Sequence, residues 1–398
     1  MLKREKYLSK IRDFYDSDLI KVIIGMRRTG KSVLLKQIIE ELKERDIDDK
    51  HIIYINFEDV EFNFIKNYLN LNNYIKDLIK DDKKYYLLFD EIQLVEDWEK
   101  VINSFKATLN SSVFITGSNS KLLSGELATL LSGRYVSFKV CPFTFREVVE
   151  FKKLKTKEEI EDAFNDYILW GGLPQRFEFD TIDKVKTYLS DVFDSIVVKD
   201  IIKRYNVSNV TLLERIIEYF VTNPSQVFSP TNMLNEFNKE GIPISSKTIY
   251  ECLDYITSSL LMNEASVYDV RGKRILSRKD KYYLTDLGIG QLVNTNKKLQ
   301  LGSYLENIVY NELIYRGYDV SVGNNNDKEI DFIATRFDEK IYFQVAYILA
   351  EQSTIDREFG AYYKIDDNYP KYVLTMDKFD FSQNGIIHKN IIDWLLDK

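Results

Sequence analysis

The strongest constraint on the fold is a glycine-rich segment between an apolar run and a helical pattern. The run is Leu19–Gly25, and the helical pattern extends from Lys31 to about Arg45. The segment fits GxxxxGK[ST] in full and consists of Gly25, Met26, Arg27, Arg28, Thr29, Gly30, Lys31 and Ser32. A loop of this kind surrounds phosphate with backbone N–H groups at the positive end of a helix. We expect these residues to bind ATP, with Lys31 on the β- and γ-phosphates and the Ser32 hydroxyl on Mg²⁺.

A second signal is an acidic pair, Asp90 and Glu91, directly after the apolar run Tyr85–Phe89. On its own, such a pair is typical of an ordinary turn after a buried strand. Together with a phosphate-binding loop, it predicts that Asp90 holds Mg²⁺, directly or through water, and that Glu91 polarises the attacking water. The two strand ends therefore predict a site for Mg²⁺-dependent ATP hydrolysis.

Two further positions are candidates for catalysis. Ser118 and Asn119 follow the run Ser112–Thr116, where a polar side chain could sense the γ-phosphate, and Asn119 is the candidate. A cap between strand and helix is an equally good explanation. Arg134 precedes the run Tyr135–Val140, and a guanidinium there suits contact with a phosphate in a neighbouring subunit of a homo-oligomer. A surface ion pair explains Arg134 equally well.

The pattern of apolar runs predicts the fold class. Short runs alternate with helical patterns over the first third of the chain: Leu19–Gly25, His51–Phe57, Tyr85–Phe89, Ser112–Thr116 and Tyr135–Val140. Such alternation is typical of an α/β fold in which helices cover both faces of a parallel sheet.

The rest of the chain has a different pattern. It is helical from Phe145 to about Val207, with a break at Trp170–Pro174 that contains two glycines and a proline. Three helical patterns and a strand-like stretch then fit a winged helix-turn-helix. The last block predicts a helix, two strands and an asparagine-rich loop: Tyr304–Arg316, Glu329–Thr335, Lys340–Leu349 and Asn324–Asn326.

Several motifs resemble one family and occur in the same order, and the resemblance runs from near the first residue to near the last. These motifs are IIGMRRTGKS, YINFED, LLFDEI, FITGSNSKLLSGELATLLSGRY, PFTFREVVEF and WGGLP. They resemble the bacterial and archaeal AAA-like ATPases whose C-terminal region is called DUF4143. The resemblance implies a P-loop ATPase domain of the ASCE type, a helical lid, a winged-helix region and a PD-(D/E)XK nuclease-like α/β domain. We place these at residues 1–144, 145–206, 207–295 and 296–398.

The resemblance to nucleases breaks down at the residues that carry their chemistry. PD-(D/E)XK nucleases hold Mg²⁺ with a helical Glu and strand carboxylates, and a Lys activates water. Glu306 and Asp331 match this pattern, but Gln344 replaces a carboxylate and Ala346 replaces the lysine. A lysine from another element could still take that place. We expect no nuclease activity and expect this domain to bind a partner or DNA.

Charge restricts how the chain could bind nucleic acid. It has 55 Lys and Arg against 62 Asp and Glu, a net charge of −7, so bulk charge does not hold it on a polyanion. The stretch from Arg271 to Lys281 is locally basic and lies beside the winged-helix pattern, so we expect it to contact DNA. A solvated hairpin is the alternative. Its basic residues are Arg271, Lys273, Arg274, Arg278, Lys279 and Lys281.

Other classes are excluded by composition. Two cysteines and two histidines, without metal-ligand spacing, argue against a zinc site or a disulfide scaffold. No apolar run approaches the length of a membrane span, and the first residues lack the apolar centre of a signal peptide. We therefore expect a cytoplasmic protein that does not bind membranes.

Three functions fit these observations. The first is ATP hydrolysis coupled to nucleic-acid binding or remodelling. The second is a nucleotide-regulated switch that binds a protein partner, and the third is a nuclease controlled by ATP.

Overall fold

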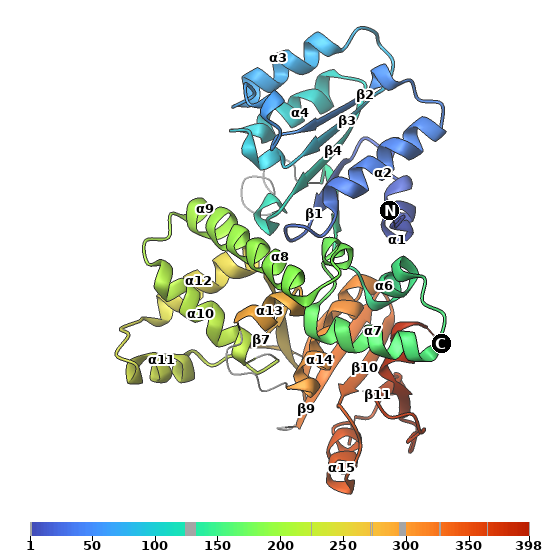
Figure 1. Cartoon of the computed structure of the whole chain (residues 1–398), viewed down its shortest axis with the longest axis vertical. Helices are drawn as coiled ribbons and strands as arrows, with labels where there is room; N and C mark the ends of the chain where they lie inside the picture. The colour runs from blue at the N-terminus through green and yellow to red at the C-terminus, as the bar shows by residue number, and fades with distance from the viewer. Residues whose placement is uncertain are drawn as a thin grey trace. The chain divides into compact units, whose positions relative to one another are not determined.

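The computed structural model describes residues 2–123, 133–223, 225–270, 272, 274–293, 300–325, 328–363 and 365–397 (Figure 1). The side chains of residues 121, 123 and 276–279 lie outside this description. The chain divides into two compact units. One consists of Met1–Cys141 with Ser258–Leu260, and the other of Pro142–Thr257 with Leu261–Lys398.

Among its described residues, the first unit contains a five-stranded sheet in the order β2-β3-β4-β1-β5. Every neighbouring pair is parallel. The strands are β1 (Ile20–Ile24), β2 (Ile52–Asn56), β3 (Tyr85–Asp90), β4 (Ser111–Gly117) and β5 (Tyr135–Lys139). Each end lies within one residue of a predicted apolar run, so the predicted α/β fold with a parallel sheet is confirmed.

Helices cover both faces of this sheet. Figure 1 shows α2 (Lys31–Glu44) on one side of it and α3 (Tyr68–Leu78) and α4 (Trp98–Thr108) on the other. All residues of β1 and β3 are buried, as expected for strands covered on both faces, and this is why they read as continuous apolar runs. The unit also has α1 and short 3₁₀ helices: Glu5–Arg12, Asp49–His51, Val60–Phe62, Ile92–Leu94 and Ser120–Leu123.

The second unit begins with helices. They are α6 (Phe145–Lys152), α7 (Lys157–Trp170), a 3₁₀ helix (Pro174–Glu178), α8 (Ile182–Ser195), a π-helical stretch (Ile196–Ile202), α9 (Lys203–Tyr205), α10 (Val210–Thr222), α11 (Pro230–Lys239) and α12 (Ser246–Ser258). Further along the chain follow α13 (Leu287–Val293), α14 (Leu301–Arg316), α15 (Gln352–Gly360) and α16 (Ile391–Leu395). No helix within the described ranges is both long and apolar enough to cross a bilayer.

The described residues of this unit form a seven-stranded sheet in the order β12-β11-β10-β9-β8-β6-β7. Its strands are β6 (Met262–Asp269), β7 (Arg274–Leu284), β8 (Asp319–Asn325), β9 (Lys328–Arg336), β10 (Glu339–Val345), β11 (Lys371–Thr375) and β12 (Ile387–Asn390). β6 and β7 form an antiparallel hairpin at the position of the predicted wing, and β6 also pairs in parallel with β8. The sheet therefore crosses the boundary predicted between residues 295 and 296, and the division of residues 145–398 into three domains stays a prediction.

The asparagine-rich loop was predicted wrongly. Asn324 and Asn325 belong to β8, while Asn326 lies outside the described residues. The Asn325 amide donates hydrogen bonds to the carbonyl oxygens of Ala361 at 3.1 Å and Tyr363 at 3.0 Å. Its polar side chain is therefore compatible with a buried position in a strand.

Close packing explains why glycine occurs at the break after α7. Gly171 has φ of 71°, and a side chain there would place its Cβ 2.0 Å from Asp286 Oδ1. The backbone N–H groups of Gly172 and Gly288 donate to the two Asp286 carboxylate oxygens at 2.7 and 2.9 Å. Burial raises the pKa of Asp286, and these two N–H groups oppose that effect. The break thus packs closely against the residues that lead into α13.

Candidate functional site

The phosphate-binding loop connects β1 to α2. Arg28 and Gly30 have left-handed backbones, with φ of 65° and 97°. Gly30 adopts this conformation without steric cost. Gly25 is required for another reason, because a Cβ there would lie 2.5 Å from the carbonyl oxygen of Val140. Both glycines of the motif are therefore needed for the shape of the loop, which can turn backbone N–H groups toward one anion.

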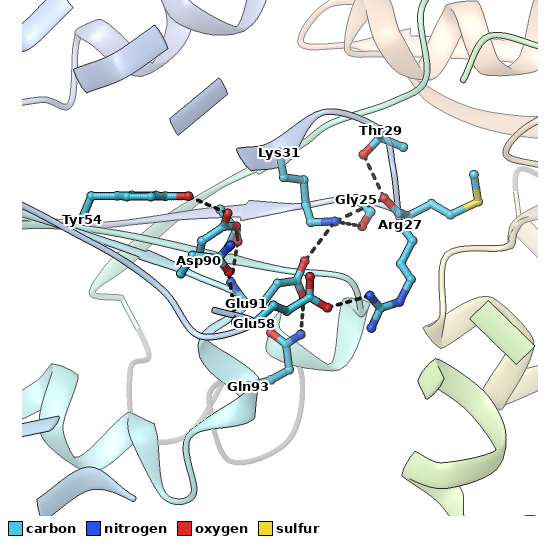
Figure 2. Close-up of polar contacts among 12 residues, drawn as sticks. Gly25, Arg27, Thr29, Lys31, Tyr54, Glu58, Asp90, Glu91 and Gln93 are labelled. Carbon is cyan, nitrogen blue, oxygen red and sulfur yellow. Dashed lines mark hydrogen bonds and ion pairs between the residues drawn. The ribbon is translucent and has the colours of Figure 1, made fainter. Parts of the chain in front are cut away.

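Lys31 begins α2, and its ammonium group points into the loop (Figure 2). Nζ donates to the carbonyl oxygens of Gly25 at 3.0 Å and Met26 at 3.2 Å. It also lies 3.5 Å from Glu91 Oε1, and only 4% of Lys31 is exposed. Ser32 follows in the first turn of the helix and is half-buried. The loop thus already holds a cation where the predicted phosphate groups would lie.

Asp90 ends β3 and is fully buried. Thr116 Oγ1 donates to Asp90 Oδ1 at 2.5 Å, and the Tyr54 hydroxyl donates to Oδ2 at 3.1 Å. Among the described residues, no lysine or arginine forms an ion pair with Asp90. Neutral hydroxyl groups orient the carboxylate without cancelling its charge, which suits a group that holds a divalent cation.

Glu91 has a left-handed backbone with φ of 55°, and its N–H donates to Thr116 Oγ1 at 2.9 Å. Its carboxylate accepts a hydrogen bond from Gln93 Nε2 on one oxygen and faces Lys31 with the other. Burial opposes ionisation, but Lys31 and Gln93 outweigh it and hold the pKa of Glu91 below its ordinary value. Glu91 is therefore an ionised, oriented carboxylate beside the phosphate-binding loop.

The sheet order brings these groups together. β4 lies between β1 and β3, and parallel pairing places their carboxyl ends at one edge. Asn119, buried two residues beyond β4, follows the same edge. Its catalytic role stays a prediction.

Arg134 lies at the opposite edge. Its carbonyl oxygen accepts a hydrogen bond at 2.9 Å from the N–H of Ile20, the first residue of β1. β1 has 5 residues, so its first and last Cα atoms are four steps apart, or roughly 13 Å at about 3.3 Å per residue. The guanidinium is exposed and donates to Asn103 Oδ1 at 3.1 Å. The role of Arg134 at a phosphate site in a neighbouring subunit stays a prediction.

We predict that Arg134→Ala loses ATP hydrolysis and keeps ATP binding. Mixing it with Lys31→Ala protein should restore part of the activity, because each variant supplies the group that the other lacks. Lys100→Ala on α4 is the matched control and should hydrolyse ATP normally. If the variants assemble together and the mixture stays inactive, Arg134 has only a structural role.

Sequence reasoning missed four residues around this site. Tyr54 and Thr116 hold Asp90, Gln93 holds Glu91, and Glu58 Oε1 accepts from Arg27 Nη1 at 3.0 Å (Figure 2). Tyr54, Glu58 and Thr116 do lie within motifs that carried the resemblance, which is a signal, and Gln93 directly follows one of them. No linear pattern places Thr116 beside Asp90, because the pairing of β3 with β4 depends on strand order.

A buried cluster in the second unit contains the residues that resemble a nuclease site. Lys281 Nζ on β7 donates to Glu306 Oε1 on α14 at 3.1 Å and also pairs with Glu329 on β9. The Tyr283 hydroxyl donates to the same Glu306 oxygen at 2.7 Å. These carboxylates raise the pKa of Lys281 despite its burial, so it remains charged.

The predicted contact of Lys281 with DNA is therefore wrong, because only 3% of its side chain is exposed and carboxylates surround it. Of the other basic residues in the stretch, Arg274 is exposed. The remaining ones lie outside the described residues or have side chains outside the description: Arg271, Lys273, Arg278 and Lys279.

Gln344 acts as a hydrogen-bonding partner within this region. Its Oε1 accepts from the Asp331 N–H at 2.7 Å, and its Nε2 donates to Glu358 Oε2 at 2.8 Å. Burial and the nearby Glu306 raise the pKa of Asp331 well above its ordinary value. Within the described ranges, no group of three or more His, Cys, Asp or Glu side chains is arranged to hold a metal ion. In this cluster Lys281 supplies the positive charge that pairs with Glu306 and Glu329.

Lys281→Met should destabilise the protein by about 3–5 kcal/mol, because it leaves buried carboxylates without their cation. Arg274→Met on the same strand is the control, since an exposed substitution changes stability by less than about 0.5 kcal/mol. Urea denaturation of both variants measures the difference. Equal midpoints would show that Lys281 adds nothing to stability.

Comparison with known proteins supports the assignment of the first unit. Residues 17–149 match the family described as an AAA domain. An uncharacterized protein of Haemophilus influenzae is 39% identical over 399 residues, covering 100% of this chain and 99% of that protein. The uncharacterized protein MJ1544 of Methanocaldococcus jannaschii is 35% identical, covering 87% of this chain and 78% of that protein. The chain belongs to the same family as these two proteins.

The first unit contains an AAA-like P-loop ATPase domain. Three findings agree on this: the AAA-domain match, the parallel sheet and the phosphate-binding loop. Residues 161–300 match DUF8612, a domain of unknown function, which differs from the DUF4143 that the sequence resemblance named. A structure of the Aeropyrum pernix Orc1 protein in complex with DNA is 12% identical. The superposition covers 74% of this chain and 93% of that chain, with a TM-score of 0.34.

Proposed function

We propose that the protein hydrolyses ATP with Mg²⁺ and couples this turnover to nucleic-acid binding. The observation that carries the proposal is the convergence of Lys31, Asp90 and Glu91 at one sheet edge, with Lys31 Nζ 3.5 Å from Glu91 Oε1. A cation in a glycine loop beside two differently partnered carboxylates fits phosphoryl transfer to water.

The residues have distinct roles in this proposal. When bound, ATP would supply the γ-phosphoryl group that is transferred, and Mg²⁺ would neutralise the charge that develops on it. Lys31 exchanges its contacts with the loop carbonyl groups for phosphate oxygens. Ser32 and Asp90 hold the metal ion. Glu91, ionised and released from Lys31, accepts a proton from the attacking water.

The coupling to nucleic acid is supported by α10, α11 and α12, which precede the hairpin of β6 and β7 as in a winged helix. Arg274 on the hairpin and Lys247 on α12 are exposed cations. Both can contact phosphate groups of a duplex.

A protein partner is the second candidate, and the composition of α12 favours it. Lys247 pairs with Glu251 at 3.8 Å, and Asp254 adds a further negative charge to this helix. Because Lys281 is buried, the region of α12 and the hairpin exposes less positive charge than the sequence indicated. A nucleotide-regulated switch needs no basic surface.

The test is the ATPase rate without DNA, with single-stranded DNA and with duplex DNA, on protein whose oligomeric mass has been measured. We expect Mg²⁺-dependent turnover that DNA stimulates, and no turnover from Lys31→Ala protein. Turnover that is indifferent to DNA would favour the protein-partner switch. If the wild type hydrolyses no ATP under any condition, the proposal is wrong.

We also propose that the protein does not cut DNA. A lysine does reach the cluster, but Lys281 is buried between Glu306 and Glu329 and cannot meet a scissile phosphate. We expect no cleavage of plasmid, linear duplex or single-stranded DNA with Mg²⁺ or Mn²⁺, with or without ATP. Cutting that persists in Lys31→Ala and disappears in Asp331→Ala would contradict this prediction.

A further inference from the structure

We propose that Gln93 is a positioning residue that orients both the Glu91 carboxylate and the water that Glu91 activates. This inference rests on the proposed ATP hydrolysis and assigns one more residue to it. Gln93 lies in the 3₁₀ helix Ile92–Leu94, directly after the acidic pair.

The amide nitrogen of Gln93 fixes the orientation of Glu91. Gln93 Nε2 donates to Glu91 Oε2, while Glu91 Oε1 faces Lys31 (Figure 2). The two carboxylate oxygens thus have different partners, which prevents free rotation of the group. When Lys31 turns toward phosphate groups, the Gln93 contact is what still holds the carboxylate in place. One oxygen, Oε1, is then free to accept a proton.

The amide oxygen of Gln93 is available for a ligand. Gln93 Oε1 is buried and accepts no hydrogen bond from the part of the chain that the structure describes. Buried acceptors in proteins are almost always paired, either with protein or with ordered water. The amide is correctly oriented for this, because its other end must donate to a carboxylate.

Gln93 Oε1 lies at the sheet edge where the proposed hydrolysis takes place. A Cβ at Gly117 would lie 2.7 Å from Gln93 Oε1. Gly117 ends β4, between the ends of β1 and β3. The oxygen therefore lies close to the end of β4, between the two strand ends that supply the loop and the acidic pair, and the lack of a side chain at Gly117 lets Gln93 and Leu122 approach there.

A water held there would have both of its O–H groups engaged. One O–H donates to Glu91 Oε1 and the other to Gln93 Oε1, so that a lone pair of the water oxygen is free to attack. The new bond joins that oxygen to the γ-phosphorus, and the bond from the phosphorus to the bridging oxygen breaks. The water proton passes to Glu91, and ADP leaves with the electron pair. Gln93 stays neutral throughout.

The experiment compares Gln93→Leu, which has a similar size but neither polar group, with Gln93→Glu, which keeps an acceptor and loses the donor. Gln352→Leu, an exposed glutamine on α15, is the control. For Gln93→Leu we expect kcat to fall roughly 10- to 100-fold, in line with the loss of an oriented proton acceptor. The Kd for ATP should change less than about 2-fold, because Gln93 does not contact phosphate groups in this proposal.

Gln93→Glu provides a second readout. Its carboxylate keeps an acceptor but cannot donate to Glu91 Oε2. We therefore expect kcat to fall in Gln93→Glu as well, while the Kd for ATP again changes less than about 2-fold. A glutamine with a merely structural role would lower ATP binding and kcat together.

A double variant separates positioning from folding. In a Glu91→Gln background, Gln93→Leu should reduce kcat by less than about 2-fold further, since no carboxylate remains to be oriented. Loss of kcat by the same factor in both backgrounds, or loss of ATP binding in parallel with kcat, overturns the inference. Normal kcat in Gln93→Leu also overturns it and leaves the proposed hydrolysis intact. A wild type that hydrolyses no ATP overturns both.

Discussion

Lys31→Ala protein is expected to show no detectable ATP hydrolysis and much weaker ATP binding. Lys31 Nζ lies inside the phosphate-binding loop, where it contacts Gly25 and Met26. Removal of a single preorganised donor at a reacting centre typically costs about 10²- to 10³-fold in rate. Here the same change also removes positive charge from the bound phosphate groups, so binding falls as well.

The matched control for this prediction is Lys36→Ala, an exposed lysine on the same helix. Isothermal titration with ATP and a phosphate-release assay measure binding and turnover separately. Because Lys36 lies away from the loop, its variant should match the wild type in both. Normal turnover by Lys31→Ala would rule out the whole assignment of this loop.

Glu91→Gln protein is expected to bind ATP normally and to turn over ~10²-fold more slowly or worse. Glutamine keeps the shape of the side chain, but it cannot accept a proton from water. In the wild type, Lys31 and Gln93 hold the pKa of Glu91 below its ordinary value, so the group is ionised at neutral pH. The rate should therefore decline on the acidic side as Glu91 becomes protonated, and this decline should be absent in Glu91→Gln.

Glu96→Gln, an exposed glutamate shortly after the same strand, serves as the control. Measurement of kcat from acidic to neutral pH for both variants and the wild type distinguishes the alternatives. If Glu91→Gln retains wild-type turnover and the same acidic limb, another group is the base.

Much of the first unit could be predicted from sequence because its signals are local. A run such as Tyr85–Phe89 is apolar at every position since both faces of its strand are covered, and the structure extends it only to Asp90. The phosphate-binding loop is equally local: Gly25 and Gly30 are required by steric contact and backbone conformation within a few residues of the motif.

The second unit was predicted less completely, because its pairing is not local. Residues Val267–Asp269 of β6 pair with Val322–Asn324 of β8, more than fifty residues later in the chain, and no local pattern predicts this pairing. From the sequence, Lys281 is predicted to be an exposed cation in a basic stretch. Only the approach of α14 and β9 shows that Glu306 and Glu329 enclose it.

The strands of the first unit, the glycine loop and the acidic pair follow from the sequence alone, since each depends on residues adjacent in the chain. Which groups meet is known only from the folded chain: Thr116 with Asp90, Gln93 with Glu91, and Lys281 with Glu306. The fold also places Arg134 beside the first residue of β1, with its guanidinium on Asn103. The physical reason is that burial, charge pairing and strand order depend on residues far apart in sequence, and no local pattern encodes them.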